Sequence, residues 1–255
     1  MEPILEFIHV CFSYHTVAGE TPALYDISLS VAPGEFIAVV GPSGCGKTTL
    51  LSLVSGLLAP ESGEIRLFGK AQGTSGANIG YMLQRDHLFE WRTVYDNVLL
   101  GLEIRHSLNP DTRGHVREML QTYGLSAFQD APPSALSGGM RQRAALIRTL
   151  ALEPDILLLD EPFSALDYQT RLEVGDDIGS IIRREHKTAI LVTHDLAEAI
   201  TLADRIVILS ARPARIKKIL PLSFDESCTS PLKRRSSPQF SGYFEEVWKE
   251  LKSHE

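Results

Sequence analysis

The chain has 255 residues, a formal net charge of −7 and 44% hydrophobic residues, a balance typical of globular proteins. Its length predicts one or two domains, and its negative charge argues against a general nucleic-acid-binding protein. It contains no run of about 18 consecutive apolar residues, so we expect no membrane span, and "MEPILEFIHV" lacks the pattern of a signal peptide. Cys11, Cys45 and Cys228 are widely spaced, which indicates free thiols in a reducing cytosol.

The first part of the chain predicts strands around one short helix. Residues 4–14 and 24–31 alternate apolar and polar side chains, with one break in phase in the first segment, as half-buried antiparallel strands do. The run "FIAVV" (36–40) is apolar throughout, which favours a strand buried on both faces. A helix is expected over 47–58 and a short strand over 64–69.

The middle of the chain predicts helices, and strands alternate with helices after it. Residues 86–155 are expected to be mostly helical, with interruptions at "SLNPDTRG" and "APPSA". Beyond them, strands and helices are predicted in alternation, at 155–161, 168–185, 187–195, 196–204 and 205–210. Such alternation indicates a parallel sheet in an α/β fold. From Pro221 the sequence is polar and rich in Ser, Pro and Arg, with "KRR" (233–235) expected on a solvated face, until an amphipathic helix at 240–252.

The stretch "GPSGCGKT" has the spacing of a phosphate-binding loop. Gly41, Gly46, Lys47 and Thr48 satisfy G-x-x-x-x-G-K-[ST] between a predicted strand and a predicted helix. The glycines let backbone N–H groups turn toward an anion, Lys47 supplies a positive charge, and the Thr48 hydroxyl can ligate Mg²⁺. The alternative is a glycine-rich turn with an incidental lysine, which the strand–loop–helix context disfavours. We also expect the Cys45 thiol inside this loop to react with alkylating reagents.

Two acidic residues follow the buried run "ILLL". Asp160 and Glu161 come at the carboxyl end of that strand, where ligands bind in open α/β sheets. Asp160 is placed to hold Mg²⁺, and Glu161 is a candidate general base for an attacking water. Taken alone, the pair could simply end a strand; beside a phosphate loop it predicts a catalytic role.

A second anion-binding pattern occurs at "LSGGMRQR". Ser137, Gly138 and Gly139 precede a predicted helix, and the N-terminus of such a helix attracts anions. One nucleotide loop does not need a second such site in the same chain. The simpler alternative is an ordinary serine cap.

At this point the chain resembles a known family, the ATP-binding subunits of ABC transporters, from about Leu5 to Leu220. "GPSGCGKTT" and "ILLLDEP" resemble the Walker A and B motifs, and "LSGGMRQR" resembles the family signature. The resemblance implies a P-loop NTPase fold: an α/β RecA-like parallel-sheet core, an N-terminal antiparallel β subdomain and a helical signature subdomain at about 86–155. It implies an ATPase domain over 1–220, followed by a tail with a short helix over 221–255.

The resemblance also implies roles for individual residues. Gln84 resembles the Q-loop glutamine that reaches Mg²⁺, "SALD" (164–167) resembles the D-loop at the dimer interface, and His194 resembles the switch histidine. Tyr14 stands where an aromatic residue stacks on adenine, although a strand-end tyrosine is a rival interpretation. Lys47, Gln84, Glu161 and His194 would be catalytic, and Thr48, Gln84 and Asp160 would hold the metal. The implied nucleotide contacts are Tyr14, Gly41, Pro42, Ser43, Gly44, Cys45, Gly46, Lys47, Thr48, Thr49, Ser137, Gly138 and Gly139.

Partners and location follow from the same resemblance. Two copies would bind ATP and Mg²⁺ between them, head to tail, so that the signature of one completes the site of the other. The homodimer would act on the cytoplasmic face of the membrane with permease subunits, indirectly with a solute-binding protein, and without nucleic acid. "LFEWRTVYDNV" and "LSARPARI" resemble the nitrate/sulfonate/taurine importer branch, which also includes importers of thiamine precursors. Phe89 and Trp91 would either line a permease groove or pack the helical subdomain.

The rival function is a soluble ABC ATPase that acts on nucleic acid or ribosomes. Such an enzyme needs either a long coiled coil between the Walker A loop and the signature or two sets of motifs in one chain. The sequence has no sustained heptads there and carries one set. A small GTPase would need the guanine-reading N-K-x-D, which is absent.

Overall fold

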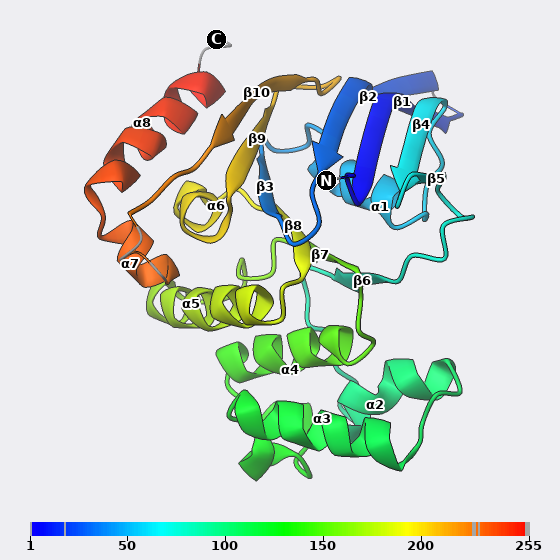
Figure 1. Cartoon of the computed structure of the whole chain (residues 1–255), viewed down its shortest axis with the longest axis vertical. Helices are drawn as coiled ribbons and strands as arrows, with labels where there is room; N and C mark the ends of the chain where they lie inside the picture. The colour runs from blue at the N-terminus through cyan, green and yellow to red at the C-terminus, as the bar shows by residue number, and fades with distance from the viewer. Residues whose placement is uncertain (1, 18, 226–227, 229, 253–255) are drawn as a thin grey trace.

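The computed structural model describes residues 2–17, 19–225, 228 and 230–252, which form two β-sheets and three groups of helices (Figure 1). The larger sheet has the strand order β10–β9–β3–β8–β7–β6, and all neighbours except the antiparallel pair β10–β9 are parallel. Its strands are β3 (Phe36–Val40), β6 (Ile79–Met82), β7 (Ile156–Asp160), β8 (Thr188–Val192), β9 (Arg205–Leu209) and β10 (Ile216–Pro221). The parallel α/β core predicted from the sequence is confirmed.

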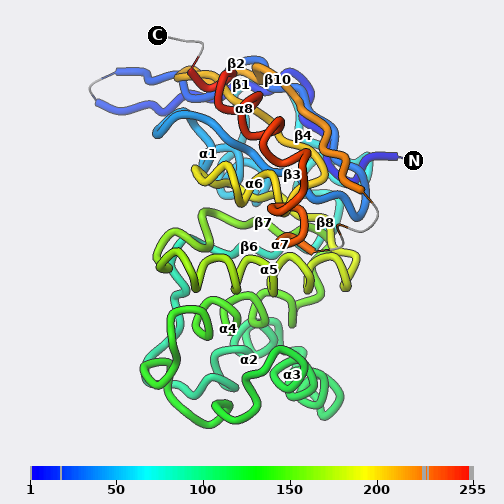
Figure 2. The backbone as a smooth tube through the Cα atoms, turned by 90° about the vertical axis from the view of Figure 1, so that its left-hand side faces the viewer, coloured from blue at the N-terminus to red at the C-terminus, as the bar shows by residue number. Residues whose placement is uncertain are grey.

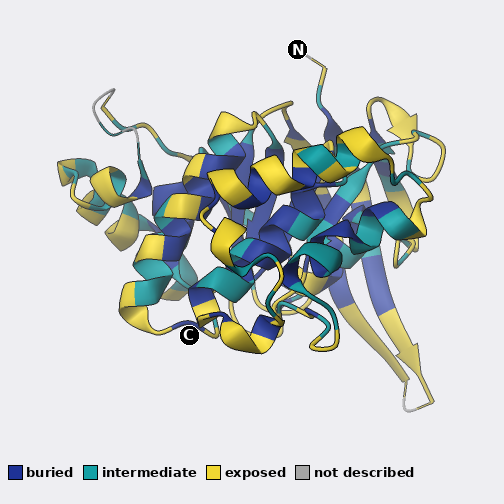
Figure 3. Cartoon of the chain, turned by 90° about the horizontal axis from the view of Figure 1, so that it is seen from below, coloured by how far each residue is buried: buried dark blue, intermediate teal, exposed yellow. Residues whose placement is uncertain are grey.

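The smaller sheet is antiparallel, in the order β2–β1–β4–β5. Its strands are β1 (Leu5–Thr16), β2 (Gly19–Val31), β4 (Ser62–Leu67) and β5 (Lys70–Ala71). The break in the apolar pattern of the first strand corresponds to a register shift between Phe7 and Val10, around His9 at φ 50°. The β1–β2 hairpin is buried at its base and exposed toward its tip (Figure 3).

The two faces of the larger sheet pack against different partners because successive side chains of a strand point to opposite faces. Ile37 and Val39 of β3 pack with α1 (Lys47–Val54) and the smaller sheet. Phe36, Ala38 and Val40 pack with the remaining helices. This burial on both faces is the physical reason for the uninterrupted apolar run of β3.

A helical subdomain lies at the β6 side of the larger sheet (Figure 1). It contains α2 (Val94–Ile104), α3 (Pro110–Thr122) and α4 (Gly138–Leu150), with 3₁₀ turns at Ser126–Phe128 and Pro133–Ala135. The side chains of Thr93 and Asn109 cap α2 and α3, and Asn109 forms a capping box with Thr112. These caps explain why the expected helical region divides at "SLNPDTRG".

The remaining helices cover the sheet face opposite α1. They are α5 (Tyr168–Arg184), α6 (Leu196–Leu202), α7 (Pro231–Arg235) and α8 (Pro238–Lys252). α8 runs along the side of the molecule against α6 (Figures 1 and 2). In the described part of the chain, no helix is both long enough and apolar enough to cross a membrane.

The C-terminal segment differs from the expected polar tail with one short helix. It forms two helices, and Val247 of α8 is fully buried in the same core cluster as β3 and α6. Arg234, expected on a solvated face, donates hydrogen bonds to the carbonyls of Thr201 and Ala203 at the end of α6. A guanidinium near the C-terminus of a helix satisfies carbonyls that the helix leaves free, so the basic cluster serves packing as well as solvation.

Candidate functional site

The phosphate-binding loop follows β3 directly and leads into α1. Gly46 has φ 124°, and a side chain on it would meet Leu24 at 2.9 Å and the Ala23 carbonyl at 3.1 Å, so only glycine fits without strain. No side chain caps α1, which leaves its first backbone N–H groups available to an anion. The Lys47 side chain is buried and donates from Nζ to the carbonyls of Gly41 (2.9 Å) and Pro42 (3.0 Å). The loop therefore has the shape and charge of a phosphate cradle.

The structure argues against the alkylation-sensitive thiol expected at Cys45. The side chain is 1% exposed, and its Sγ occupies the space beside Gly41, where a Cβ would lie only 2.9 Å away. Burial raises the pKa of the thiol above its ordinary value, against the smaller opposing effect of Lys47. The glycine leaves room that the cysteine fills, a contact that the loop pattern alone does not reveal.

We expect Cys45 to react with N-ethylmaleimide more slowly than Cys11 or Cys228, which are both partly exposed. The reason is that the reactive thiolate is both rare and sterically covered at Cys45. Mass spectrometry of tryptic peptides after timed labelling measures the three rates. Labelling of Cys45 as fast as that of Cys11 would contradict the buried position.

Asp160 lies at the end of β7 beside the phosphate loop. The Thr48 hydroxyl donates to its Oδ1 at 3.3 Å, and the Tyr81 hydroxyl faces its Oδ2 at 3.5 Å. Burial raises the pKa of Asp160, and burial together with the Asp160 charge raises that of Tyr81 to about 12. Tyr81 thus keeps its proton and can donate to the carboxylate. The sequence pattern did not point to Tyr81, which comes from the short strand β6.

Glu161, Gln84 and His194 meet next to Asp160. Glu161 Oε2 lies 3.3 Å from Gln84 Nε2, which donates to it, and 3.2 Å from His194 Nδ1. Gln84 Nε2 also donates to Ser164 Oγ at 3.3 Å, another contact that the sequence did not predict. The backbone of Glu161 is in the left-handed region, at φ 46°, which is unusual for a residue other than glycine. Such backbone strain is frequent at functional sites, and the carboxylate of this strained residue faces His194.

Tyr14 lies beside the same loop. Its hydroxyl is 2.9 Å from Thr49 Oγ1 on α1, and the Arg212 guanidinium carbon lies 5.9 Å from the centre of its ring. The tyrosine therefore sits next to the phosphate loop and can offer a flat face to a nucleotide base. Its stacking role stays a prediction.

The signature residues lie apart from this group. Ser137 caps α4 by accepting from Met140 N at 3.4 Å, and a side chain on Gly139 would meet Val174 and Thr170 of α5. Ser137 and Gly138 are exposed, so the N-terminus of α4 faces solvent. The structure thus brings the Walker, Gln84 and His194 residues together within one chain, while the second anion-binding pattern lies at the exposed start of α4.

Glu198 is a buried acid near the site that the sequence did not point to. It lies on α6 with its side chain 11% exposed, accepts from the Thr193 hydroxyl at 2.6 Å and lies 3.8 Å from Arg171. Burial raises its pKa to about 7, against the Thr193 hydrogen bond and the Arg171 charge. The only sequence pattern that could have pointed to Glu198 is the presence of an acidic residue four positions after His194.

We expect Glu198→Gln to change how stability depends on pH. A carboxyl with pKa about 7 in the folded chain and 4.5 when unfolded holds its proton more tightly when folded. As pH rises from about 4.5 to about 7, the free energy of unfolding of the wild type therefore falls relative to that of the variant. The fall reaches up to about 3 kcal/mol. Urea unfolding of the wild type and the variant at pH 5 and pH 8 measures this difference in the free energy of unfolding. An equal pH dependence in both would contradict the raised pKa.

Comparison with known proteins agrees with this site. The family described as ABC transporter matches residues 24–164. An uncharacterized ABC transporter ATP-binding protein of Bacillus subtilis is 44% identical over 97% of this chain and 95% of its own length. The aliphatic sulfonates import ATP-binding protein SsuB of Bacillus licheniformis is 44% identical over 84% of this chain and 83% of its own.

A solved structure gives the same result for the fold. The dimeric ATP-binding cassette MJ0796, in a post-hydrolysis state bound to ADP and Pi, superimposes with a TM-score of 0.73 at 28% sequence identity. The match covers 86% of this chain and 99% of that one. Together with the phosphate loop and the acids at the end of β7, these similarities establish that the chain belongs to the ABC transporter family, as an ATP-binding subunit that hydrolyses ATP.

Proposed function

We propose that the chain is the ATPase subunit of an importer, that two copies bind ATP and Mg²⁺ between them, and that the pair drives a permease from the cytoplasmic face of the membrane. The observation that carries the proposal is the exposed N-terminus of α4. It has the dipole and the exposed capping serine of an anion site, yet it lies away from the phosphate loop of its own chain. A second copy, placed head to tail, would bring it to the γ-phosphate.

Within each site, Lys47 and the N-termini of α1 and α4 would stabilise the charge that develops on the transferred phosphoryl group. Glu161 would accept a proton from the attacking water, with His194 and Gln84 holding that carboxylate through the contacts already described.

The ATPase domain would span 1–220. Helix α8, which contributes to its core, would belong to the same folding unit.

The residues around Asp160 suit Mg²⁺. They offer a hydroxyl oxygen on Thr48 and a carboxylate on Asp160, which touch each other, and an amide on Gln84 nearby. Mg²⁺ prefers oxygen ligands and is usually held by one or two protein groups together with substrate phosphates. Among the residues that the structure describes, no cluster of three or more His, Cys, Asp or Glu side chains could hold a metal ion by itself. Bound Mg²⁺ would supply positive charge that stabilises the phosphates held by the loop.

The permease would dock on the loop that follows Gln84. Trp91 is 78% exposed and stacks on Phe89, with ring centres 4.6 Å apart, so the pair presents an aromatic surface rather than filling the helical subdomain. The buried amide of Asn97 holds the loop by accepting from Phe89 N and donating to its carbonyl. A rigid aromatic surface of this kind suits a short helix of a partner.

The same loop is tied to the signature helix. Arg141 of α4 forms ion pairs with Asp86 at 2.9 Å and with Glu90 at 2.8 Å. Arg148 of the same helix donates to the carbonyls of Asp86 and His87. Movement of the permease against Trp91 would therefore move α4, whose N-terminus would contact ATP of the other copy.

The transported solute is proposed by similarity. A relative 44% identical is named for aliphatic sulfonate import, and "LFEWRTVYDNV" and "LSARPARI" resemble the same branch. We propose a small solute of that kind, such as a sulfonate, taurine, nitrate or a thiamine precursor, delivered by a solute-binding protein. The ATP-binding subunit would not contact it.

Disulfide trapping tests the shared site. Chains carrying Ser43→Cys are mixed with chains carrying Ser137→Cys, both in a Glu161→Gln background that preserves ATP. Both serines are exposed. With MgATP and a mild oxidant, we expect a covalent dimer on a non-reducing gel, because the loop of one copy would face the signature of the other.

Two controls define the outcome. Omission of ATP should abolish the covalent dimer, and Ser241→Cys, on an exposed position of α8, replaces Ser137→Cys as the matched partner. Cross-linking no stronger than with Ser241→Cys, at any nucleotide concentration, would show that the two elements do not meet between copies and would overturn the head-to-tail arrangement.

A further inference from the structure

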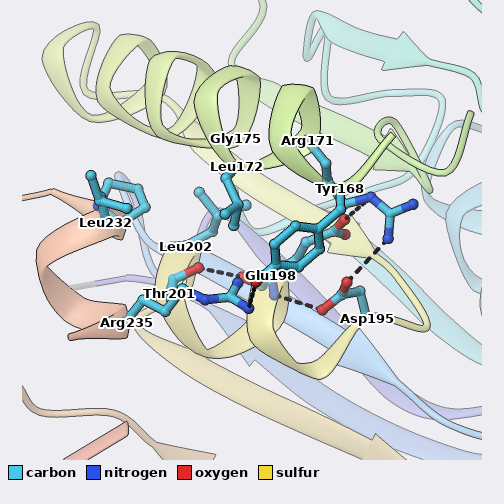
Figure 4. Close-up of a pocket in the computed structure, with 11 residues that line it drawn as sticks. Tyr168, Arg171, Leu172, Gly175, Asp195, Glu198, Thr201, Leu202, Leu232 and Arg235 are labelled. Carbon is cyan, nitrogen blue, oxygen red and sulfur yellow. Dashed lines mark hydrogen bonds and ion pairs between the residues drawn. The ribbon is translucent and has the colours of Figure 1, made fainter. Parts of the chain in front are cut away.

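Arg171, in the first turns of α5, connects two segments that are far apart in the sequence (Figure 4). Its Nη2 donates to the Leu166 carbonyl at 3.1 Å, and its Nη1 donates to Asp195 Oδ2 at 3.2 Å. Its Nε lies 3.8 Å from Glu198 Oε1 as an ion pair. One guanidinium thus joins the segment 164–167 to the start of α6.

The partners of Arg171 surround His194 on the chain. The Thr193 hydroxyl donates to Glu198 Oε2 and accepts from Asp195 N at 3.0 Å. Asp195 Oδ1 caps α6 by accepting from Ala197 N at 2.8 Å. Both neighbours of His194 are therefore fixed to groups that Arg171 holds, while His194 itself points to Glu161.

The burial of this cluster makes the arrangement specific. The Arg171 side chain is 22% exposed, and Glu198 is more deeply buried. Buried charges are stable only when they are paired, so loss of the guanidinium would leave two carboxylates close together. The planar guanidinium donates to Leu166 and to Asp195 while its Nε lies beside Glu198, an arrangement that the single ammonium of lysine cannot reproduce.

We propose that Arg171 is a positioning residue for ATP hydrolysis, which clamps the His194 segment to the segment 164–167. The proposal rests on the proposed function, in which His194 holds the Glu161 carboxylate and two copies assemble head to tail, and on the resemblance of 164–167 to the loop at the interface of such a pair. Under those roles, the approach of a second copy against 164–167 shifts Leu166, and Arg171 passes that shift to both neighbours of His194. The clamp links assembly of the dimer to hydrolysis.

Steady-state kinetics of Arg171→Gln, with Arg184→Gln as the matched control at the far end of the same helix, tests the clamp. We expect kcat of Arg171→Gln to fall about tenfold while KM for ATP changes less than about twofold, because nucleotide binding does not involve this residue. Arg171→Lys should recover part of kcat, and Arg184→Gln should keep it. Circular dichroism checks that each variant is folded, and Arg171→Lys carries the comparison if Arg171→Gln does not fold.

A second comparison, made in a chain that already carries His194→Ala, distinguishes a positioning role of Arg171 from a general structural role. In a His194→Ala chain, the added Arg171→Gln change should cost less than about twofold, because the group being positioned is already gone. Losses that multiply in the double variant, or an Arg171→Gln kcat equal to that of Arg184→Gln, would overturn the clamp. If His194→Ala itself hydrolyses ATP at the wild-type rate, the proposed role of His194 fails instead.

Discussion

Lys47→Ala is expected to lower kcat/KM for ATP hydrolysis on the order of 10²–10³-fold. The lysine is buried in the phosphate loop, and its ammonium lies against the carbonyls of Gly41 and Pro42. The γ-phosphate would draw this ammonium from the carbonyls, so its charge acts most strongly as negative charge develops in the transition state. Alanine also removes attraction for bound ATP, so KM should rise. Phosphate release at several ATP concentrations measures both effects.

The matched control for this prediction is Lys70→Ala, which removes a lysine from an exposed position of β5. It should keep wild-type kinetics, since charges on the surface are screened by solvent and salt. A Lys47→Ala enzyme within about twofold of the wild type would contradict the assignment of the loop as the catalytic phosphate site.

Glu161→Gln is expected to lower kcat by about 10²–10⁴-fold, the usual contribution of a general base, while ATP still binds. Glutamine has the same size and can keep a contact with Gln84, but it cannot take a proton from water. With hydrolysis blocked, ATP stays in the site and should hold two copies together. Light scattering with MgATP should therefore report a mass of two chains for the variant and one chain after ATP is removed.

Glu153→Gln provides a closely matched control, because Glu153 is also a glutamate with a left-handed backbone, at φ 49°, but is exposed and lies before β7. It should hydrolyse ATP at the wild-type rate and should not accumulate as a dimer. Wild-type hydrolysis by Glu161→Gln would show that another group is the base.

Local sequence patterns were sufficient to predict the core and the phosphate loop. The β3 run is apolar throughout because both faces are buried, and the glycine spacing before Lys47 follows from the backbone that the loop needs. Asp160 and Glu161 could be placed because they end an equally apolar strand. In each case, the residues that determine the structure are neighbours in the sequence.

Contacts between distant residues could not be predicted in this way. Tyr81 reaches Asp160 from a strand of four residues, too short to show a period, and Arg171 meets Glu198 only after α5 and α6 pack together. The buried Cys45 depends on the space left by Gly41. The C-terminal segment has a polar composition, and among the residues described there only Pro231 and Val247 are buried.

Affinity purification of the tagged chain from detergent-solubilised membranes of its native host tests the importer assignment most directly. Wild type is compared with Phe89→Ala/Trp91→Ala and with Leu57→Ala, which removes an apolar side chain after α1 that is nearly as exposed as Trp91. We predict that a multi-span permease accompanies the wild type and Leu57→Ala and is lost from the double variant, while all three hydrolyse ATP. Recovery of the wild type as a soluble complex with nucleic acid or ribosomes, and no permease, would contradict the transport function.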